Sequence, residues 1–214
     1  MNLPNPCRLC LAPAAALLVL VGLAGCNVAQ PAQDDPTRYF ILSGPAGQPG
    51  RPSAAPGGAR VGLVTVRLEG YLKRREMVVR MGENEVQFRD FRLWAEPLDR
   101  AITRVVKTSL LQSAGVAQVY TDPFPADSVR DYDVAIEVSR CEGSASRSGS
   151  YAASFTATIE VSTAGPNPHV VARKLFVAPA AAWDGENFGQ LASLLSSDAA
   201  ALGQEVASEI SSRN

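Results

Sequence analysis

The chain has 214 residues, with 20 lysines and arginines against 21 aspartates and glutamates. This near-balance argues against nucleic-acid binding, because that function requires positive charge gathered on one face. With 46% hydrophobic residues, the chain is long and apolar enough to form one domain with a substantial core.

The N-terminal segment predicts export from the cytoplasm. Arg8 precedes an uncharged, apolar run over residues 11–24, which is shorter than the roughly 20 residues that a membrane-spanning helix requires. The run ends in Leu23-Ala24-Gly25-Cys26, and small residues before a cysteine resemble the cleavage site of a bacterial lipoprotein. We therefore predict a signal peptide over residues 1–25.

Cys26 is the predicted lipidation site, because its thiol can carry a diacylglycerol group and become the new N-terminus. Additional acyl chains such as palmitate would hold the protein firmly, since a single chain binds a membrane only marginally. Asn27 follows in place of the aspartate that favours retention in the inner membrane, so we expect the outer membrane. Residues 26–37 are polar and contain prolines, which predicts a lipidated tether. Cys141 would remain as the one free thiol, with no intramolecular disulfide.

Alternating apolar and polar residues predict strands along much of the remaining chain. A stretch rich in glycine and proline, residues 43–59, predicts a flexible loop after the first strand. Turn-forming residues at 82–85 and 165–168 predict two hairpins. The expected strands cover residues 38–42, 61–66, 77–79, 86–88, 116–120, 132–138, 151–161 and 170–177.

Two segments repeat their apolar residues at helical spacing. The first covers residues 98–110 and follows Pro97, a residue suited to the first turn of a helix. The second is long and amphipathic, covers residues 188–210, and has Asp184 or Asn187 as its expected N-cap.

These elements predict one domain over residues 38–214. The hairpins require antiparallel pairs, whereas the strand that follows the first helix is suited to a parallel pair, so the sheet should be mixed. We expect an α/β domain, with α+β as the other option, in which two main helices pack on a sheet of about six or seven strands.

Carboxylates are abundant, so a glycosidase pair stays open, although no two of them stand out. Histidine and cysteine, in contrast, are scarce. The single histidine, His169, lies in a proline-rich turn, and one histidine with one remaining cysteine does not make a metal site. A phosphate-binding loop of the ATPase type is absent from the sequence. We therefore expect a protein that is not an enzyme and has no catalytic residues, no metal and no cofactor beyond the lipid on Cys26.

The basic segment Lys73-Arg74-Arg75 follows Tyr71 and is a candidate contact for an acidic partner or for anionic head groups. A solvated loop is the alternative. Arg80 alternates with hydrophobic neighbours, so it either lines an interface or pairs with an acid inside the domain.

Several short motifs occur in a characteristic order along the chain. They are Arg38-Tyr39-Phe40-Ile41-Leu42, Tyr71-Leu72, Arg74, Val78-Val79, Arg80, Asn84, Trp94-Ala95-Glu96-Pro97-Leu98 and Asp131-Tyr132. This order resembles the family of ABC-type transport auxiliary lipoproteins, which includes the PqiC-like lipoproteins that accompany MCE-domain lipid transporters. Lys73 and Leu93 depart from the residues that the family often has at these places.

The resemblance implies a non-enzymatic lipoprotein of the outer membrane that faces the periplasm. It would serve an MCE-type ABC system that moves lipids or other hydrophobic solutes between the inner and outer membranes. Its partners would be an MCE-domain protein, with the permease and ATPase of the inner membrane, and a homo-oligomer stays open. The motif residues Tyr71, Trp94, Glu96 and Pro97 are expected to act structurally. The alternatives are a periplasmic ligand-binding lipoprotein and a structural lipoprotein of another envelope assembly.

Overall fold

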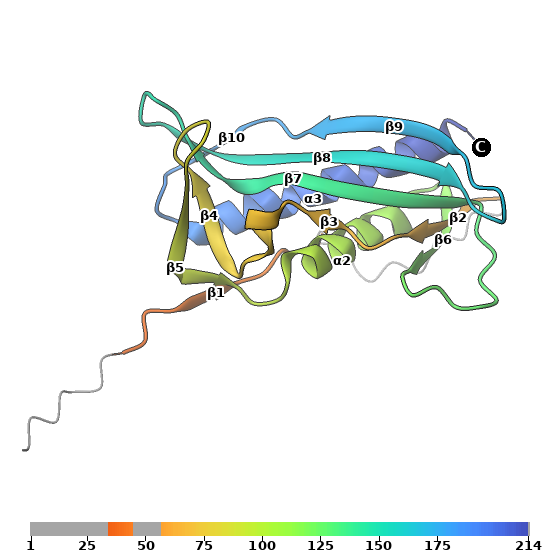
Figure 1. Ribbon diagram of the computed structural model, residues 1–214, viewed down its shortest axis with the longest axis horizontal. Coiled ribbons are helices and arrows are strands. Elements are labelled where there is room, and N and C mark those ends of the chain that lie inside the picture. Colours follow the sequence, from red (N-terminus) through yellow and green to blue (C-terminus); the bar gives the residue numbers. More distant parts are fainter. Residues whose placement is uncertain (1–33, 45–56, 214) are drawn as a thin grey trace, which may run out of the picture. The chain divides into compact units, whose positions relative to one another are not determined.

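The computed structural model describes residues 34–44 and 57–213 (Figure 1). The predicted signal peptide, Cys26 and most of the tether lie outside the described residues, as does much of the predicted loop over residues 43–59. Residues Thr37–Asn214 make up one compact unit, and this unit contains all of the elements that follow.

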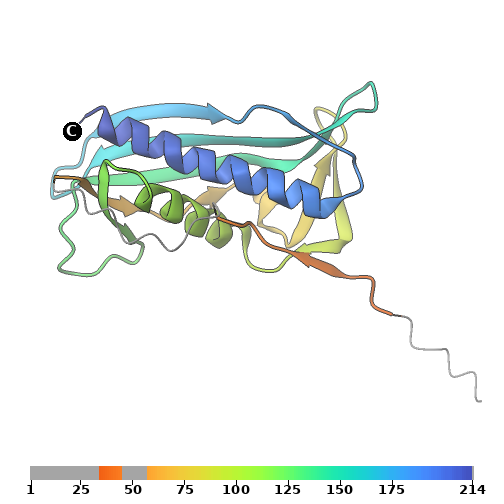
Figure 2. The same cartoon turned by 180° about the vertical axis from the view of Figure 1, so that it is seen from behind.

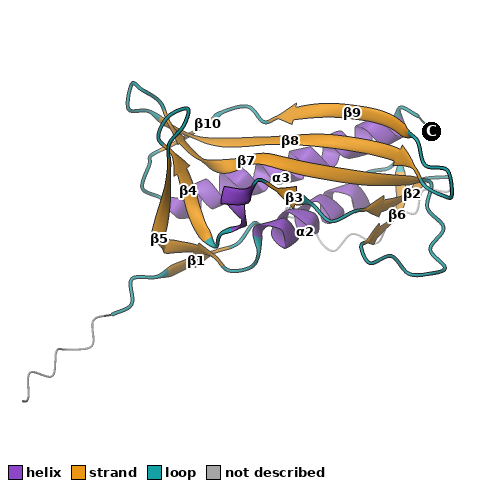
Figure 3. Cartoon of the chain, viewed as in Figure 1, coloured by secondary structure: helices purple, strands orange, loops and turns teal. Residues whose placement is uncertain are grey.

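The described residues form a ten-stranded mixed sheet and two α-helices, together with one short 3-10 helix (Figure 3). The elements are β1 (Arg38–Phe40), β2 (Ala59–Leu63), β3 (Arg67–Leu68), η1 (Gly70–Lys73), β4 (Glu76–Arg80), β5 (Val86–Trp94), α2 (Leu98–Leu111), β6 (Val116–Thr121), β7 (Tyr132–Ala145), β8 (Tyr151–Thr163), β9 (Val170–Val177), β10 (Ala181–Trp183) and α3 (Phe188–Ser211).

A long antiparallel hairpin of β7 and β8 is the centre of the sheet, with pairs from Tyr132–Thr163 to Ala145–Tyr151. Three short strands, β2, β3 and β4, lie in turn along the other edge of β7, each parallel to it. Beyond them, β6 pairs with β2, and β5 and then β1 extend the sheet from β4. The strands β9 and β10 pair with β8.

The α/β class, the mixed sheet and the two helices are as predicted, but the expected six or seven strands are too few. Eight of the ten strands lie at the eight segments with a strand pattern, and the other two are very short. β3 has two residues and β10 has three, so neither is long enough to show an alternating pattern. The two predicted hairpins are present as β4–β5 and β8–β9.

Both helices pack on the same side of the sheet (Figure 2). The side chain of Asn187 caps α3 by accepting a hydrogen bond from the Gln190 N–H at 3.0 Å, so it is Asn187 rather than Asp184 that takes this role. The two helices approach closely at Gly203, where an added Cβ would lie 2.6 Å from the Cβ of Ser109. The Ser109 hydroxyl donates to the Ala200 carbonyl at 2.8 Å, which satisfies a polar group at this buried contact.

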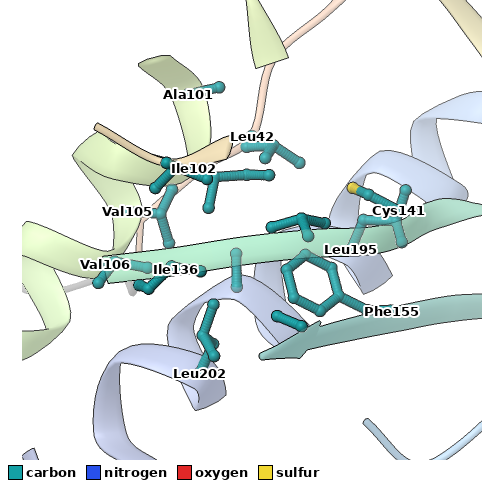
Figure 4. Close-up of a cluster of buried hydrophobic side chains, with 14 of the residues drawn as sticks. Leu42, Ala101, Ile102, Val105, Val106, Ile136, Cys141, Phe155, Leu195 and Leu202 are labelled. Carbon is teal, nitrogen blue, oxygen red and sulfur yellow. The ribbon is translucent and has the colours of Figure 1, made fainter. Parts of the chain in front are cut away.

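The hydrophobic core lies between these helices and the sheet (Figure 4). Cys141 belongs to it, with 2% of its surface exposed, and burial raises the pKa of its thiol. The thiol is therefore unreactive, and the side chain acts as a small hydrophobe. Fully buried members include Leu42, Ile102, Ile136, Phe155, Leu195 and Leu202.

Candidate interaction surface

The motif predicted to be structural forms the junction between β5 and α2. Trp94 is the last residue of β5 and is 3% exposed, and its backbone N–H donates to the Arg75 carbonyl at 2.7 Å. Pro97 stands at the N-cap position, one residue before the first turn in which the sequence had placed it. Glu96 forms an ion pair with Arg104, whose guanidinium also donates to the Leu42 carbonyl at 2.9 Å. These contacts fix the start of α2 against the segment after β1.

Tyr71 and Arg80 meet Glu142 in a buried polar cluster on the sheet. The Arg80 Nε donates to Glu142 Oε1 at 2.5 Å, and an Arg80 Nη donates to the Tyr71 hydroxyl at 3.1 Å. The hydroxyl in turn donates to the Ser139 carbonyl at 2.9 Å. Burial, followed by the nearby charge of Glu142, raises the pKa of Tyr71 to about 12, so the hydroxyl keeps its proton.

This cluster decides between the two roles considered for Arg80. Arg80 pairs with an acid inside the domain, and only 17% of its side chain is exposed. Of its two candidate roles, this geometry favours the internal ion pair. The sequence did not identify Glu142 as the partner of Arg80. A bulge between Val138 and Arg140 breaks the alternation of β7 just before Glu142.

The three cations of the basic segment are exposed and turn towards different neighbours. Arg74 pairs with Glu76 at 2.7 Å, and its guanidinium carbon lies 4.4 Å from the centre of the Phe88 ring. The guanidinium carbon of Arg75 lies 5.9 Å from the centre of the Tyr39 ring on β1. Lys73 ends η1 and borders a groove. The three positive charges therefore lie apart on the surface and do not converge on a single binding site.

The groove beside Lys73 has a volume of about 620 Å³ and lies between β3, η1, α2 and β7. Its wall mixes acids, cations and aliphatic side chains, and it opens widely to solvent. Such a wall can bind a polar group weakly, but no single chemistry dominates it. The lining residues are Val66, Arg67, Leu68, Lys73, Leu98, Asp99 and Glu137.

No group of three or more histidine, cysteine or acidic side chains that could hold a metal ion occurs in residues 34–44 and 57–213. His169 lies in the turn between β8 and β9, where its Nδ1 is 3.0 Å from the Thr163 hydroxyl oxygen. In the same part of the chain, no helix combines the length and the apolar character that crossing a membrane requires.

Residues 40–207 match the protein family described as the ABC-type transport auxiliary lipoprotein component. The match covers most of the chain, so the protein belongs to this family of lipid-anchored auxiliary components of ABC-type transport systems. The resemblance inferred from the motifs is thereby confirmed. None of the curated proteins matches the chain.

Solved structures of distant sequence share the fold. A Xanthomonas campestris protein of the family DUF330 has a TM-score of 0.66 at 17% identity, covering 80% of this chain and 93% of the other. An uncharacterized protein has a TM-score of 0.60 at 15% identity, covering 81% and 98%. The PelC dodecamer from Paraburkholderia phytofirmans has 17% identity over 80% and 95% of the two chains, but its TM-score of 0.44 is too low to carry an argument.

Proposed function

We propose that this protein is the outer-membrane, periplasm-facing auxiliary lipoprotein of an MCE-type ABC system that moves lipids or other hydrophobic solutes between the two membranes. The family match over residues 40–207 is the observation that carries the proposal. Residues 1–25 would be the signal peptide, Cys26 the lipidated anchor on a tether over residues 26–37, and residues 38–214 the auxiliary domain. The lipid conduit and ATP hydrolysis would belong to the partners.

A non-catalytic role fits the chemistry of the described residues. The only histidine is engaged in a surface turn, and Tyr71, Arg80 and Glu142 are committed to one another inside the domain. The protein would then act by holding the conduit close to the outer membrane. An anchored docking surface raises the local concentration of the partner, which strengthens a contact that is weak by itself.

The proposal is tested by recovering the full-length protein from native membranes under mild detergent and identifying its partners by mass spectrometry. We expect an MCE-domain protein together with a permease and an ATPase. Recovery of an unrelated envelope assembly would favour the structural alternative. A single bound ligand without these partners would favour the ligand-binding alternative, for which the groove beside Lys73 is the candidate site.

The basic segment is the proposed partner contact. Exposed ion pairs contribute only about 0–1 kcal/mol to stability, whereas charges across an interface set association rate and register. Replacing Lys73, Arg74 and Arg75 with serine should therefore leave the melting temperature nearly unchanged and weaken recovery of the MCE protein. The wild-type association should also weaken as salt rises.

A matched control removes the same charge elsewhere. Replacing Arg100, Arg147 and Arg173 with serine removes three exposed positive charges, one on α2, one in the β7–β8 turn and one on β9. If both triple variants lose the partner equally, the effect is one of net charge, and the basic segment is not the contact.

A further inference from the structure

Three large hydrophobic side chains are exposed at one edge of the sheet. Tyr39 is 58% exposed, Ile41 is 56% exposed and Phe91 is 51% exposed. Tyr39 belongs to β1, Ile41 follows it directly, and Phe91 belongs to β5, the strand that pairs with β1. We call these three residues the β1–β5 edge patch.

The strand register places Tyr39 and Ile41 on one side of the sheet. Tyr39 lies opposite Leu93, and register partners in a parallel pair point to the same side. Ile41 is two residues from Tyr39, so alternation directs it to that side as well. Phe91 is exposed two residues before Leu93, in the stretch of β5 where the register with β4 shifts. All three side chains therefore lie within or directly beside the β1–β5 pairs, which run from Arg38–Arg92 to Phe40–Trp94.

Such an edge is unusual in a domain that works alone in water. Within the described residues β1 pairs only with β5, so its other edge is open, as Figure 1 shows. Edge strands of soluble domains are normally protected by charge or by a covering segment, and exposed apolar clusters mark contact sites.

The position of the patch along the chain indicates what covers it. β1 is the first strand after the proposed anchor, and Arg38 is twelve residues from Cys26 (38 − 26). A fully extended chain spans at most about 3.3–3.6 Å per residue, so this stretch cannot exceed about 40 Å. The β1–β5 edge patch can therefore never move far from the bilayer that holds the lipid.

The charge around the patch is suited to a lipid surface. Arg38 on β1 is exposed beside Tyr39, whereas Arg89 and Arg92 on β5 are half-buried, with Arg89 Nε shielded from solvent and Arg92 over the Phe188 ring of α3. Arg75 adds a further cation over the Tyr39 ring. Aromatic rings with an apolar body and a polar tip favour the level of the head groups, and arginine pairs with lipid phosphates.

We propose that the β1–β5 edge patch lies on the surface of the anchoring membrane, with Tyr39, Ile41 and Phe91 at the level of the head groups and Arg38 on anionic phosphates. The proposal rests on the lipid anchor of the proposed function. It gives the domain a second attachment besides the lipid. One flexible tether alone would let the domain rotate, whereas two attachments fix which surface faces the transporter.

The test uses full-length, lipidated protein in vesicles of phosphatidylethanolamine and phosphatidylglycerol, without any transporter subunit. Tyr39→Cys is labelled with an environment-sensitive fluorophore. Labelling is selective, because Cys26 would be blocked by its lipid and Cys141 is buried. The matched control is Leu175→Cys on β9, since Leu175 is 63% exposed and belongs to a strand that pairs only with β8 in the described residues. Phe91→Cys gives an independent second position in the patch.

We expect the labels at 39 and 91 to be quenched by brominated lipid and to be shielded several-fold from iodide in the water, and the label at 175 to behave in the opposite way. Neutral phosphatidylcholine vesicles should weaken the shielding. Labels at 39 and 91 that are as accessible to iodide as the label at 175 would overturn the proposal. Shielding from iodide without quenching by brominated lipid would also overturn it, because a second copy of the chain would then cover the edge.

Flotation of the vesicles reports the anchor separately. A protein that floats while its labels at 39 and 91 remain in water leaves the proposed function standing and removes only the patch. A protein that does not float overturns both, because each requires lipid on Cys26.

Discussion

Trp94 shows how a residue can identify a family without forming a binding site. Its side chain is buried at the end of β5, and its backbone N–H bonds to Arg75, so its role is to join β5 to the start of α2. Arg80 and Tyr71 are similar cases, because Arg80 pairs with Oε1 of buried Glu142 and also donates to the Tyr71 hydroxyl. We propose the exposed cations and aromatics near β1 and β5 as the contacts with other molecules.

Trp94→Ala should lower the free energy of unfolding by about 3–5 kcal/mol, the usual loss for truncating a large buried aromatic. Urea unfolding of the protein, followed through the remaining Trp183, measures the effect. Trp94→Phe should lose clearly less, because it keeps a ring in the same space. Equal unfolding midpoints for the wild type and Trp94→Ala would contradict the structural role.

Asp198 on α3 gives a prediction that depends on pH. Burial raises its pKa from 3.8 to about 6, and one carboxylate oxygen is buried without a hydrogen-bond partner. Below 3.8 the carboxyl is protonated in both the folded and the unfolded chain. As the pH rises through about 6, the folded state must hold a charge that burial opposes, so it loses stability relative to acid conditions.

Asp198→Asn should therefore stabilise the protein at pH 7 and have little effect below pH 3.8. Each tenfold change in proton affinity is worth about 1.4 kcal/mol, and water screens a half-buried carboxylate, so we expect a gain of about 1–2 kcal/mol. Thermal unfolding of both proteins across this pH range measures it. A stabilisation that is the same at both ends of the range would assign the effect to packing instead of charge.

At the scale of elements, the ion pair of Arg80 and Glu142 joins β4 to β7. The backbone contact between these strands is short, with Val79 and Arg80 opposite Gly143 and Ser144. The side-chain pair therefore supplements a ladder with few hydrogen bonds of its own. It also holds η1 through the Tyr71 hydroxyl.

Arg80→Ala should lower the free energy of unfolding by about 3–5 kcal/mol, because it leaves the buried Glu142 carboxylate without its partner. The double variant Arg80→Met with Glu142→Leu should recover most of this loss, since neither charge then remains buried. A double-mutant cycle by urea unfolding compares the two. If the double variant is no more stable than Arg80→Ala, the loss of stability comes from lost packing and not from the unpaired charge of Glu142.

The elements with a long periodic pattern were predictable from sequence, and the way they join was not. Helices α2 and α3 and the hairpin β8–β9 follow directly from spacing and turn residues. The division of one edge of β7 among β2, β3 and β4 depends on contacts between distant segments, which no local pattern encodes. The same holds for Glu142 as the partner of Arg80, whereas the burial of Trp94 could be predicted from the proline and helix that follow it.

At the scale of the whole molecule, the anchor is the central expectation. Cys26→Ala should leave a precursor that keeps its signal peptide and takes up no palmitate, because the acyl group has no thiol to receive it. Metabolic labelling with palmitate and the mass of the protein measure this. Normal processing and labelling of the variant would contradict lipidation at Cys26. Cys141→Ala is the matched control, since it removes the buried thiol and should leave labelling unchanged.

The shared edge of β7 also has a consequence for the order of folding. β2, β3 and β4 precede β7 in the chain, yet each pairs with it. Since a chain emerges from its N-terminus, these three strands cannot join the sheet until residues 132–145 have been made. Until then the edges of β2 and β4 that later pair with β7 have no partner strand, and such unpaired edges make partly folded chains prone to aggregation.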